Sequence, residues 1–214
     1  MDLAAYIDHT LLKPDATEAM HRKLCEEAIQ YGFFCVCVNP VWVPFCSEIL
    51  AGSRSVVCSV VGFPLGASPM AAAEAQWAVG RGAAEIDMVL NAGFLKTGKT
   101  KAVLHGIRDV VEAVPGVPVK VILETCLLTD CEKKLACKLS EEAGAAYVKT
   151  STGFSGGGAT IHDVKLMRQA VGSRLGVKAS GGVRTREDAE AMIEAGASRI
   201  GTSSSIAIVN GNKK

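Results

Sequence analysis

A chain of 214 residues, 49% of them hydrophobic, can bury the core of one α/β domain, although it is short for a barrel. The formal net charge is only +1 and the longest basic run is Lys213-Lys214, so the sequence indicates neither nucleic acid nor an anionic membrane as a partner. We expect one domain over residues 1–214 that binds a small molecule.

The N-terminus and the cysteines indicate the compartment. Residues 1–5 lack the basic and apolar regions of a signal peptide, and the longest apolar runs have the length of a strand, so we expect a cytoplasmic protein. The eight cysteines include no C-x-x-C pair, and most lie within apolar patterns, as buried reduced thiols do. We therefore predict neither a disulfide nor a metal site. Cys35 and Cys37 share one face of their strand, where one could line a pocket, but core packing is the simpler explanation.

The first part of the chain alternates strand-like and helix-like segments. Strands are expected at residues 6–12, 33–39 and 55–63, and helices at 17–31, 43–50 and 70–81. Thr17 stands near the start of the first helix and Gly32 just past its end. Ser68-Pro69 fits an N-cap followed by proline at the first helical position.

The same alternation continues to the C-terminus. Strands are expected at residues 84–90, 117–123, around 147, 175–179 and 198–201, and helices at 101–113, 129–143, 160–171, 185–195 and 205–209, with a loop at 91–99. Thr129-x-x-Glu132 and Thr185-x-x-Asp188 are capping boxes, and Thr160 is an N-cap. Eight strands that alternate with helices over short connections favour a (β/α)8 TIM barrel over an open doubly wound sheet.

Four of the expected strands carry a charged residue, although a strand of a parallel sheet is normally covered on both faces. These residues are Asp87, Lys120, Lys149 and Lys178, spaced 33, 29 and 29 residues apart, or about one strand and one helix. Each could be a surface charge at a strand end. Because equivalent positions of successive βα units converge on one volume, and because Lys and Asp are seldom buried without partners, we expect all four to meet inside the barrel.

The loops after the last two strands suit a phosphate group. In a barrel the active site lies at the C-terminal ends of the strands, and phosphate commonly binds after strands seven and eight. Residues 180–183 and 201–204 are rich in glycine and serine, and glycine lets backbone N–H groups approach an anion. Gly153 and residues 155–158 add a third flexible wall. Tight turns alone would also explain these glycines.

A lysine in a desolvated interior beside a second lysine loses its proton more readily and can then attack a carbonyl carbon. Lys149 and Lys178 meet these conditions if adjacent strands hold them side by side. Asp87 would then stabilise Lys178 as a cation and hold or activate a water for proton transfer. The combination predicts Schiff-base chemistry on a phosphorylated aldehyde or ketone.

Six motifs, in order along nearly the whole chain, together resemble the deoxyribose-phosphate aldolase family. They are residues 8–14 (DHTLLKP), 36–40 (VCVNP), 61–66 (VGFPLG), 85–89 (EIDMV), 148–154 (VKTSTGF) and 178–185 (KASGGVRT). The resemblance implies a class I aldolase, without metal or other cofactor, that reversibly cleaves 2-deoxy-D-ribose 5-phosphate to D-glyceraldehyde 3-phosphate and acetaldehyde. It also implies a role in deoxyribonucleotide catabolism.

The resemblance assigns roles to individual residues. It implies that Lys149 forms the Schiff base, that Lys178 perturbs it and that Asp87 assists proton transfer. Together with the loop analysis it gives the expected substrate-binding residues, which are Thr10, Cys37, Lys120, Thr152, Gly153, Gly181, Gly182, Gly201, Ser203 and Ser204. The sequence does not define the oligomeric state, and a homodimer is the working hypothesis.

Two departures from the family pattern affect these roles. Some members end in a mobile tyrosine that helps to shuttle a proton, whereas the last tyrosine here is Tyr147 and the chain ends at residues 209–214 without one. Phe154 stands where some relatives carry a lysine that reaches the phosphate. Phosphate affinity would then depend more on backbone N–H groups and hydroxyls.

Two other functions are compatible with a barrel that holds these residues. In an isomerase, Asp87 would abstract a proton and the lysines would only stabilise an enolate, without a covalent intermediate. A catalytically silent ligand-binding barrel is the second alternative, but a binding site has no need for a neutralised lysine. A rate assay separates the alternatives.

Overall fold

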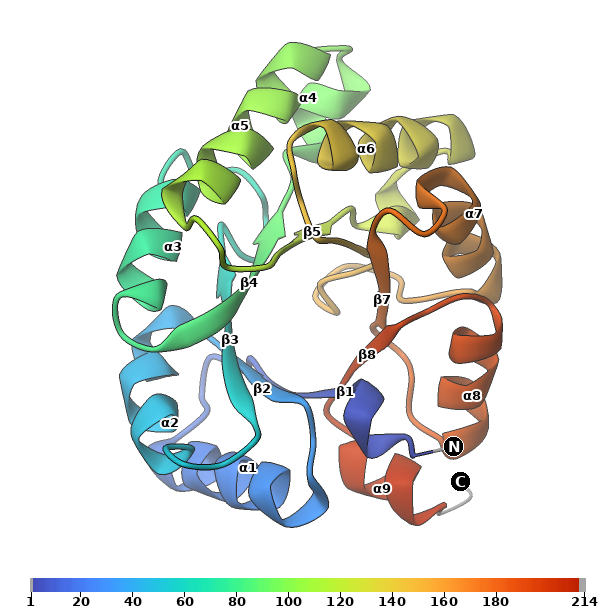
Figure 1. Cartoon of the computed structure of the whole chain (residues 1–214). Coiled ribbons are helices and arrows are strands. Elements are labelled where there is room, and N and C mark those ends of the chain that lie inside the picture. The colour runs from blue at the N-terminus through green and yellow to red at the C-terminus, as the bar shows by residue number, and fades with distance from the viewer. Residues whose placement is uncertain (1, 212–214) are drawn as a thin grey trace.

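The computed structural model describes residues 2–211, and these residues form a closed barrel of parallel strands (Figure 1). Each strand pairs with the next along the chain, and the first strand also pairs with the last. The strands are β1 Ile7–Leu11, β2 Cys35–Val38, β3 Val56–Val61, β4 Ala83–Val89, β5 Val119–Ile122, β6 Tyr147–Lys149, β7 Gly176–Ser180 and β8 Arg199–Thr202. The predicted (β/α)8 fold is confirmed.

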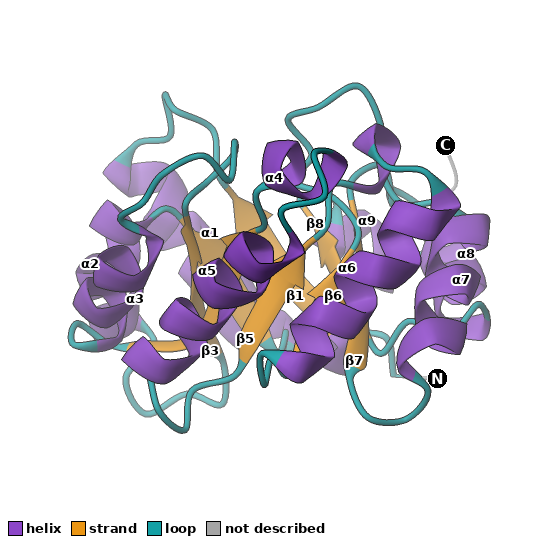
Figure 2. Ribbon diagram, turned by 90° about the horizontal axis from the view of Figure 1, so that it is seen from above, coloured by secondary structure: helices purple, strands orange, loops and turns teal. Residues whose placement is uncertain are grey.

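Helices surround the barrel and cover the outer face of its strands (Figures 1 and 2). They are α1 Glu18–Tyr31, α2 Val43–Ile49, α3 Ala71–Val79, α4 Ala92–Lys96, α5 Thr100–Ala113, α6 Asp130–Glu142, α7 Ile161–Val171, α8 Arg186–Glu194 and α9 Ser205–Asn210. Three short 3-10 helices add Ala4–Tyr6, Pro40–Trp42 and Thr125–Leu127. No helix among residues 2–211 has the length and apolar character needed to cross a membrane.

Local sequence signals set most of the helix boundaries. Both predicted capping boxes form: the Thr129 side chain accepts from the backbone of Glu132, and the Thr185 side chain accepts from that of Asp188. Thr160 caps α7, and α1 ends at Gly32, whose φ of 67° is the left-handed conformation that glycine adopts easily. These signals could be read from sequence because each satisfies backbone groups within one turn.

Two expectations along the chain were wrong. The predicted loop 91–99 contains the helix α4, because the Asn91 side chain accepts a hydrogen bond of 2.8 Å from the backbone N–H of Phe94 and caps it. Helix α3 begins after Met70 and not at Ser68-Pro69. The Ser68 hydroxyl instead accepts from the Met70 N–H at 3.1 Å, which makes a local turn ahead of the helix.

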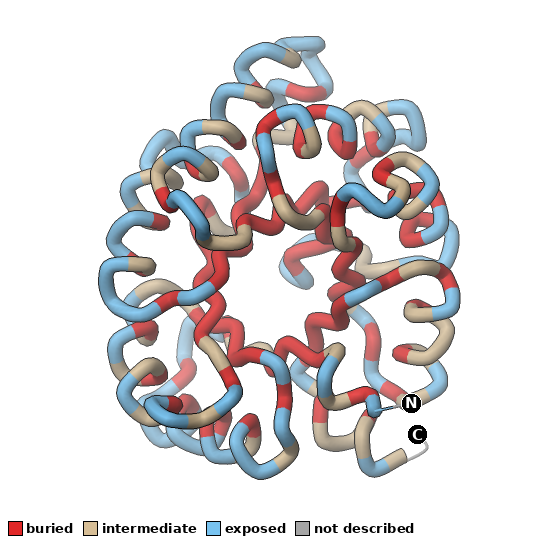
Figure 3. Tube along the Cα trace, in the orientation of Figure 1, coloured by how far each residue is buried: buried red, intermediate tan, exposed pale blue. Residues whose placement is uncertain are grey.

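Side chains of the strands divide into an outer and an inner set because successive residues point to opposite faces. The outer residues are fully buried and apolar, such as Val36, Val121 and Ile200, and they pack with the helices into the main core. Inside the barrel a separate small cluster contains Cys35, Cys37, Cys58, Val60 and Leu12. The buried trace in Figure 3 therefore follows the strands, but the centre of the barrel is not a purely apolar core.

The prediction that residues 1–214 form one domain stays a prediction. Residue 1 and residues 212–214, which include the Lys213-Lys214 run and the last three residues of the tail without a tyrosine, lie outside the described residues. Within residues 2–211, the pairing of β1 with β8 joins the two ends of the chain into one sheet.

Candidate active site

Charged side chains fill much of the barrel interior and form a closed ring of alternating sign. Each of the six is at most 5% exposed, so the ring is held away from solvent. The members of this charged ring, in the order of their contacts, are Asp87, Lys120, Glu85, Arg199, Asp8 and Lys178. A buried charge is costly unless it is paired, and here every member contacts two charges of opposite sign.

The contacts of the ring are short. Lys120 Nζ lies 2.8 Å from Asp87 Oδ1 and 2.8 Å from Glu85 Oε2. Arg199 Nη1 lies 3.3 Å from Glu85 and 2.8 Å from Asp8, and Lys178 contacts Asp8 as well as Asp87 Oδ2, the latter at 2.8 Å. The ring thus connects β1, β4, β5, β7 and β8.

Lys149 joins the ring from outside it. Its Nζ lies 2.7 Å from Asp87 Oδ2, the oxygen that Lys178 also contacts. Lys149 and Lys178 are direct partners in the register of β6 and β7, which brings the two ammonium-bearing side chains to the same carboxylate. Without Lys149 the ring has three carboxylates and three cations, so Lys149 is the group that has no carboxylate of its own.

The ring holds its members in their charged forms. Burial alone would raise the pKa of Asp87, but the buried lysine cations beside it, Lys120 first, outweigh this effect and hold that pKa well below its usual range. Burial would also raise the pKa of Asp8, but the neighbouring lysine and arginine cations outweigh it and lower that pKa to about 2. Burial disfavours the Lys178 cation, yet the carboxylates of Asp8 and Asp87 raise its pKa well above the ordinary value. Lys178 is therefore a permanent cation near neutral pH.

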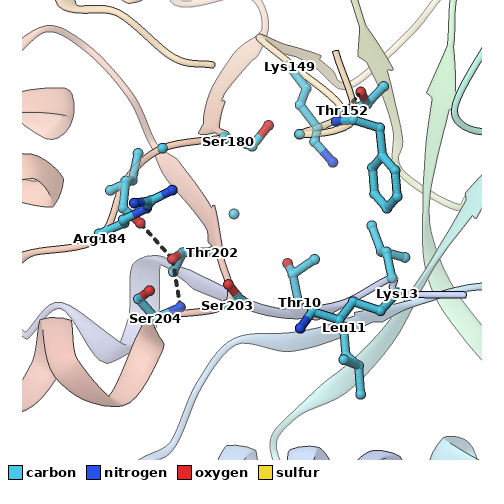
Figure 4. A pocket seen from close by; sticks show the side chains of 17 residues that line it. Thr10, Leu11, Lys13, Lys149, Thr152, Ser180, Arg184, Thr202, Ser203 and Ser204 are labelled. Atoms are coloured by element: carbon cyan, nitrogen blue, oxygen red, sulfur yellow. Dashed lines mark hydrogen bonds between the residues drawn. The ribbon is translucent and has the colours of Figure 1, made fainter. Parts of the chain in front are cut away.

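A cavity of about 410 Å³ opens above the ring, at the C-terminal ends of the strands. Lys149 reaches it from β6, and Figure 4 shows Arg184 and Ser204 across the cavity from Lys149. Thr202 joins the two loops of that far wall, because its hydroxyl donates to the Val183 carbonyl at 2.7 Å and accepts from the Ser204 N–H at 2.9 Å. The far wall is thus a connected unit of the loops after β7 and β8.

The cavity separates the sequence-predicted residues into two groups. Those that line it are Thr10, Lys149, Thr152, Gly153, Gly181, Gly182, Gly201, Ser203 and Ser204. Asp87, Lys178, Lys120 and Cys37 do not line it and lie in the barrel interior beneath it, where Cys37 Sγ is 4.0 Å from Asp87 Oδ2. The in-phase charges do converge, but Lys149 is the member of that set that meets the cavity.

Glycine at position 201 serves the buried lysine as well as the cavity wall. A Cβ atom at this position would lie 2.9 Å from Lys178 Cε and 3.0 Å from Ser180 Cβ, which is closer than side chains normally pack. Gly181 and Gly182 have φ values of 85° and 81°, a left-handed conformation that a side chain would strain. Gly201 therefore makes room for Lys178, whereas Gly181 and Gly182 shape the turn after β7.

The comparisons with known proteins agree with this geometry. A family model described as DeoC/LacD family aldolase matches residues 3–211. A deoxyribose-phosphate aldolase of Brevibacillus brevis is 61% identical over all of this chain and 97% of its own length, and one of Streptococcus sanguinis is 58% identical over 100% and 98%. The chain belongs to the DeoC/LacD family of aldolases.

Solved structures of aldolases have the same fold. A deoxyribose phosphate aldolase from Aeropyrum pernix, described as tetrameric, superimposes with a TM-score of 0.90 at 38% identity, over 97% of this chain and 89% of that one. A protein described as QR15, an aldolase, gives a TM-score of 0.94 at 40% identity, over 98% and 95%. This DeoC/LacD chain is accordingly an enzyme, and its reaction class is that of an aldolase.

Sequence reasoning missed three members of the ring in this aldolase, and the signal was present. Asp8, Glu85 and Arg199 are charged residues inside expected strands, and Glu85 lies two residues before Asp87 on the same face of β4. Arg184 and Lys13 also line the cavity and were not singled out. The regular spacing selected one charged residue on each of four consecutive strands and left out a second charge on β4 and the charges of β1 and β8.

Groups of cysteine and carboxylate side chains in the interior have the spacing of metal ligands, but cations already occupy them. One group is Cys37, Cys58 and Asp87, and a second is Asp8, Cys35 and Glu85. Their carboxylates are the acids of the charged ring, so a divalent ion would enter beside three permanent cations. A third group near the surface, Asp130, His162 and Asp163, is bridged by Lys133 at 2.6 Å and 3.1 Å. These donor sets favour lysine chemistry over metal chemistry.

Proposed function

We propose that this aldolase reversibly cleaves 2-deoxy-D-ribose 5-phosphate to D-glyceraldehyde 3-phosphate and acetaldehyde through a Schiff base on Lys149. One observation carries the proposal. Lys149 is the lysine that joins the balanced charged ring as an additional group and also reaches the cavity. With a neutral Lys149 the cluster carries no net charge, whereas its protonation would leave one buried positive charge without a carboxylate of its own. The arrangement therefore places an amine that has no carboxylate of its own where a carbonyl group can enter.

The chemical steps follow from a neutral amine at the cavity floor. Lys149 Nζ attacks the C1 aldehyde of the open-chain sugar to give a carbinolamine, whose hydroxyl group takes up a proton from water in the cavity and leaves as water, so that an iminium ion remains. A base removes the proton of the C3 hydroxyl, the C2–C3 bond breaks, and its electron pair moves toward the iminium nitrogen to form an enamine. The product D-glyceraldehyde 3-phosphate leaves, and its aldehyde carbon is the former C3 of the sugar. Protonation of the enamine carbon and hydrolysis then release acetaldehyde and restore Lys149.

Asp87 and Lys178 support Lys149 from beneath the cavity. Lys178 stays a cation because Asp8 and Asp87 hold it, and a fixed cation beside Lys149 disfavours a second one. Asp87 is fully buried and the lysine cations around it lower its pKa, so it is a weak base with no open path to a substrate carbon. We therefore assign proton transfer at carbon to a water or hydroxyl group in the cavity, and the isomerase alternative, which needs Asp87 as the base, is disfavoured.

The far wall of the cavity suits the phosphate group. The two glycines after Ser180 leave backbone groups open to close approach, Ser203 and Ser204 add hydroxyls, and Arg184 adds a cation. A volume of about 410 Å³ is within the range of small-molecule sites and accommodates a five-carbon sugar phosphate. We propose that the phosphate binds there while C1 meets Lys149 on the opposite side.

The wider setting is part of the same proposal. Two curated relatives carry the name of the deoxyribose-phosphate reaction at 58–61% identity over the whole chain, which supports a role in deoxyribonucleotide catabolism in the cytoplasm. The reaction as written requires no cofactor or metal. A homodimer is part of the proposal, and the Aeropyrum pernix relative, described as tetrameric, makes a higher oligomer the alternative to test.

Reductive trapping tests the proposal. Acetaldehyde with borohydride should inactivate the enzyme irreversibly and place an ethyl group on Lys149, which peptide mass mapping would locate. Lys149→Leu is the matched control and should not be labelled at that peptide. Cleavage that proceeds without any adduct, or an adduct on another lysine, would contradict the Schiff-base assignment and favour the enolate mechanism.

A further inference from the structure

Glu124 has an unusual backbone at the end of β5. Its φ of 55° and ψ of 64° are left-handed, and no other non-glycine residue among residues 2–211 has a positive φ. The residues on either side pair with β6 and its extension: the Leu123 N–H donates to the Lys149 carbonyl at 2.9 Å, and the Thr125 N–H to the Thr150 carbonyl at 3.0 Å. Such a conformation persists only where the surroundings hold it in place.

Hydrogen bonds to the Glu124 carboxylate hold this residue in place. The side chain is buried, and it accepts hydrogen bonds from the loop that follows Lys149. The Thr152 N–H donates to both carboxylate oxygens at 3.2 Å and 3.4 Å, the Thr152 hydroxyl donates to Oε2, and the Ser155 hydroxyl donates to Oε2 at 2.9 Å. A charged acceptor strengthens each of these bonds. Glu124 thereby fixes residues 152–155 to the neighbouring strand end.

The bonds continue to the side of the cavity. The Thr152 hydroxyl, which donates to Glu124, also accepts from the Phe154 N–H at 3.0 Å. Phe154 lines the cavity and packs edge-on against Phe63, with 5.2 Å between ring centroids and an interplanar angle of 86°. Phe154 is 51% exposed, so little else restrains it. Its loop lies across the cavity from Arg184 and Ser204, as the position of Thr152 in Figure 4 indicates.

We propose that Glu124 is a positioning residue for the sugar substrate: it holds Phe154 against Phe63 as the aromatic wall that faces the phosphate side of the cavity. This inference rests on the proposed function and extends it to substrate specificity. The carboxylate does not line the cavity and acts through the loop. A sugar phosphate that spans the cavity from Lys149 to the far wall requires both walls in place. Acetaldehyde needs only Lys149.

Glu124→Gly separates this role from a purely structural one. Glycine adopts the left-handed backbone without strain, so the turn is kept while the carboxylate is lost. KM for 2-deoxyribose 5-phosphate should rise about tenfold with kcat changed less than threefold, because binding contacts are lost equally in ground and transition states. Labelling of Lys149 by acetaldehyde and borohydride should stay within twofold of the wild-type rate. Glu124→Gln keeps one acceptor oxygen and should recover KM to within about threefold of wild type.

Phe154→Ala provides the second arm. This exposed side chain can be removed without disturbing the core, and the variant should show the same rise in KM with unchanged labelling. In the Phe154→Ala background, Glu124→Gly should add less than a twofold effect, because both changes remove the same wall.

Three outcomes would overturn the inference. KM could stay within twofold in Glu124→Gly, the two effects could multiply in the double variant, or labelling could fall together with cleavage. A failure of the proposed function looks different, since the wild-type enzyme itself would then give no Lys149 adduct.

Discussion

The charged ring and the cavity above it are built on the same barrel but are held by different forces. The ring uses side chains within the strands, each fixed by two partners of opposite charge, and no member is more than 5% exposed. The cavity wall uses the loops after the strands, where glycines, hydroxyl groups and two cations lie open to solvent. The comparison indicates that the barrel sets the charge state of the site, and we propose that the loops set its substrate choice. Lys149 belongs to both regions.

The largest expected effect comes from removing a member of the ring. Lys178→Leu leaves Asp8 and Asp87 without one of their cations, and breaking a buried pair costs about 3–5 kcal/mol. Lys149→Leu removes a group that the charge balance does not require, so its stability should stay within about 1 kcal/mol of wild type. Urea unfolding of the two variants measures this difference, and equal stabilities would contradict the ring as the source of stability.

Both lysine variants should lose activity at neutral pH, but only one should recover. In Lys178→Leu the fixed cation beside Lys149 is gone, and cleavage should fall about a hundredfold. Its residual activity should increase toward alkaline pH, because a neutral amine is the form that attacks a carbonyl carbon. Lys149→Leu should stay inactive throughout. A weak but pH-independent Lys178→Leu profile would show that Lys178 transfers protons itself.

A smaller effect is expected where the two regions touch. Gly201→Ala places a methyl group 2.9 Å from Lys178 Cε, so the lysine chain must shift from its position between Asp8 and Asp87. We expect kcat to fall about tenfold to a hundredfold while the fold persists, because small displacements in an active site cost more in rate than in stability. Gly182→Ala, which meets no atom within 4 Å but has φ of 81°, is the matched control for backbone strain alone. Equal losses in both variants would argue against the Lys178 contact.

A change confined to the loops should affect substrate choice only. Ser204→Asp introduces a negative charge on the far wall and should raise KM for 2-deoxyribose 5-phosphate about tenfold by repelling its phosphate. KM for unphosphorylated deoxyribose should change less than twofold. An equal effect on both substrates, in a folded protein, would assign the loop to structure or catalysis.

The mildest test is the dependence of stability on acid. The pKa of Asp8 is lowered to about 2 in the folded state, so its contribution is complete above the unfolded value near 3.9 and is lost as pH falls through the folded value. Asp87, whose pKa is also lowered, acts in the same direction, whereas burial raises the pKa of Glu85 and gives it the opposite sign. Asp8 alone should contribute about 2 kcal/mol between pH 5 and 2. In Asp8→Asn the free energy of unfolding should vary less steeply over this range, and an unchanged slope would contradict the assignment.

The sequence was sufficient for the fold and for the lysine that enters the cavity. Local or periodic patterns carried these predictions, namely the alternation of strands and helices, the two capping boxes and the spacing from Asp87 to Lys178. Such patterns can be read from the sequence without knowledge of tertiary contacts. The ring was only half predicted, because the contacts of Asp8 and Arg199 join residues 191 apart in the chain. Glu124 could not be predicted at all. A glutamate before Thr125 gives no sign that its backbone is left-handed, since the reason lies in hydrogen bonds from Thr152 and Ser155.

The closure of the ring across β1 and β8 bears on how the chain is made. Asp8 is synthesised 191 residues before Arg199, yet each is buried against the other at 2.8 Å. A nascent chain that stops before β8 has two open sheet edges, and its acidic residues in β1 and β4 still lack their guanidinium partner. We expect a fragment ending at residue 197 to be degraded rapidly in limited proteolysis under conditions where the full chain resists. The last strand therefore closes the sheet and completes the charge pairing of the earlier strands. We expect the barrel to resist proteases only when its final βα unit is in place.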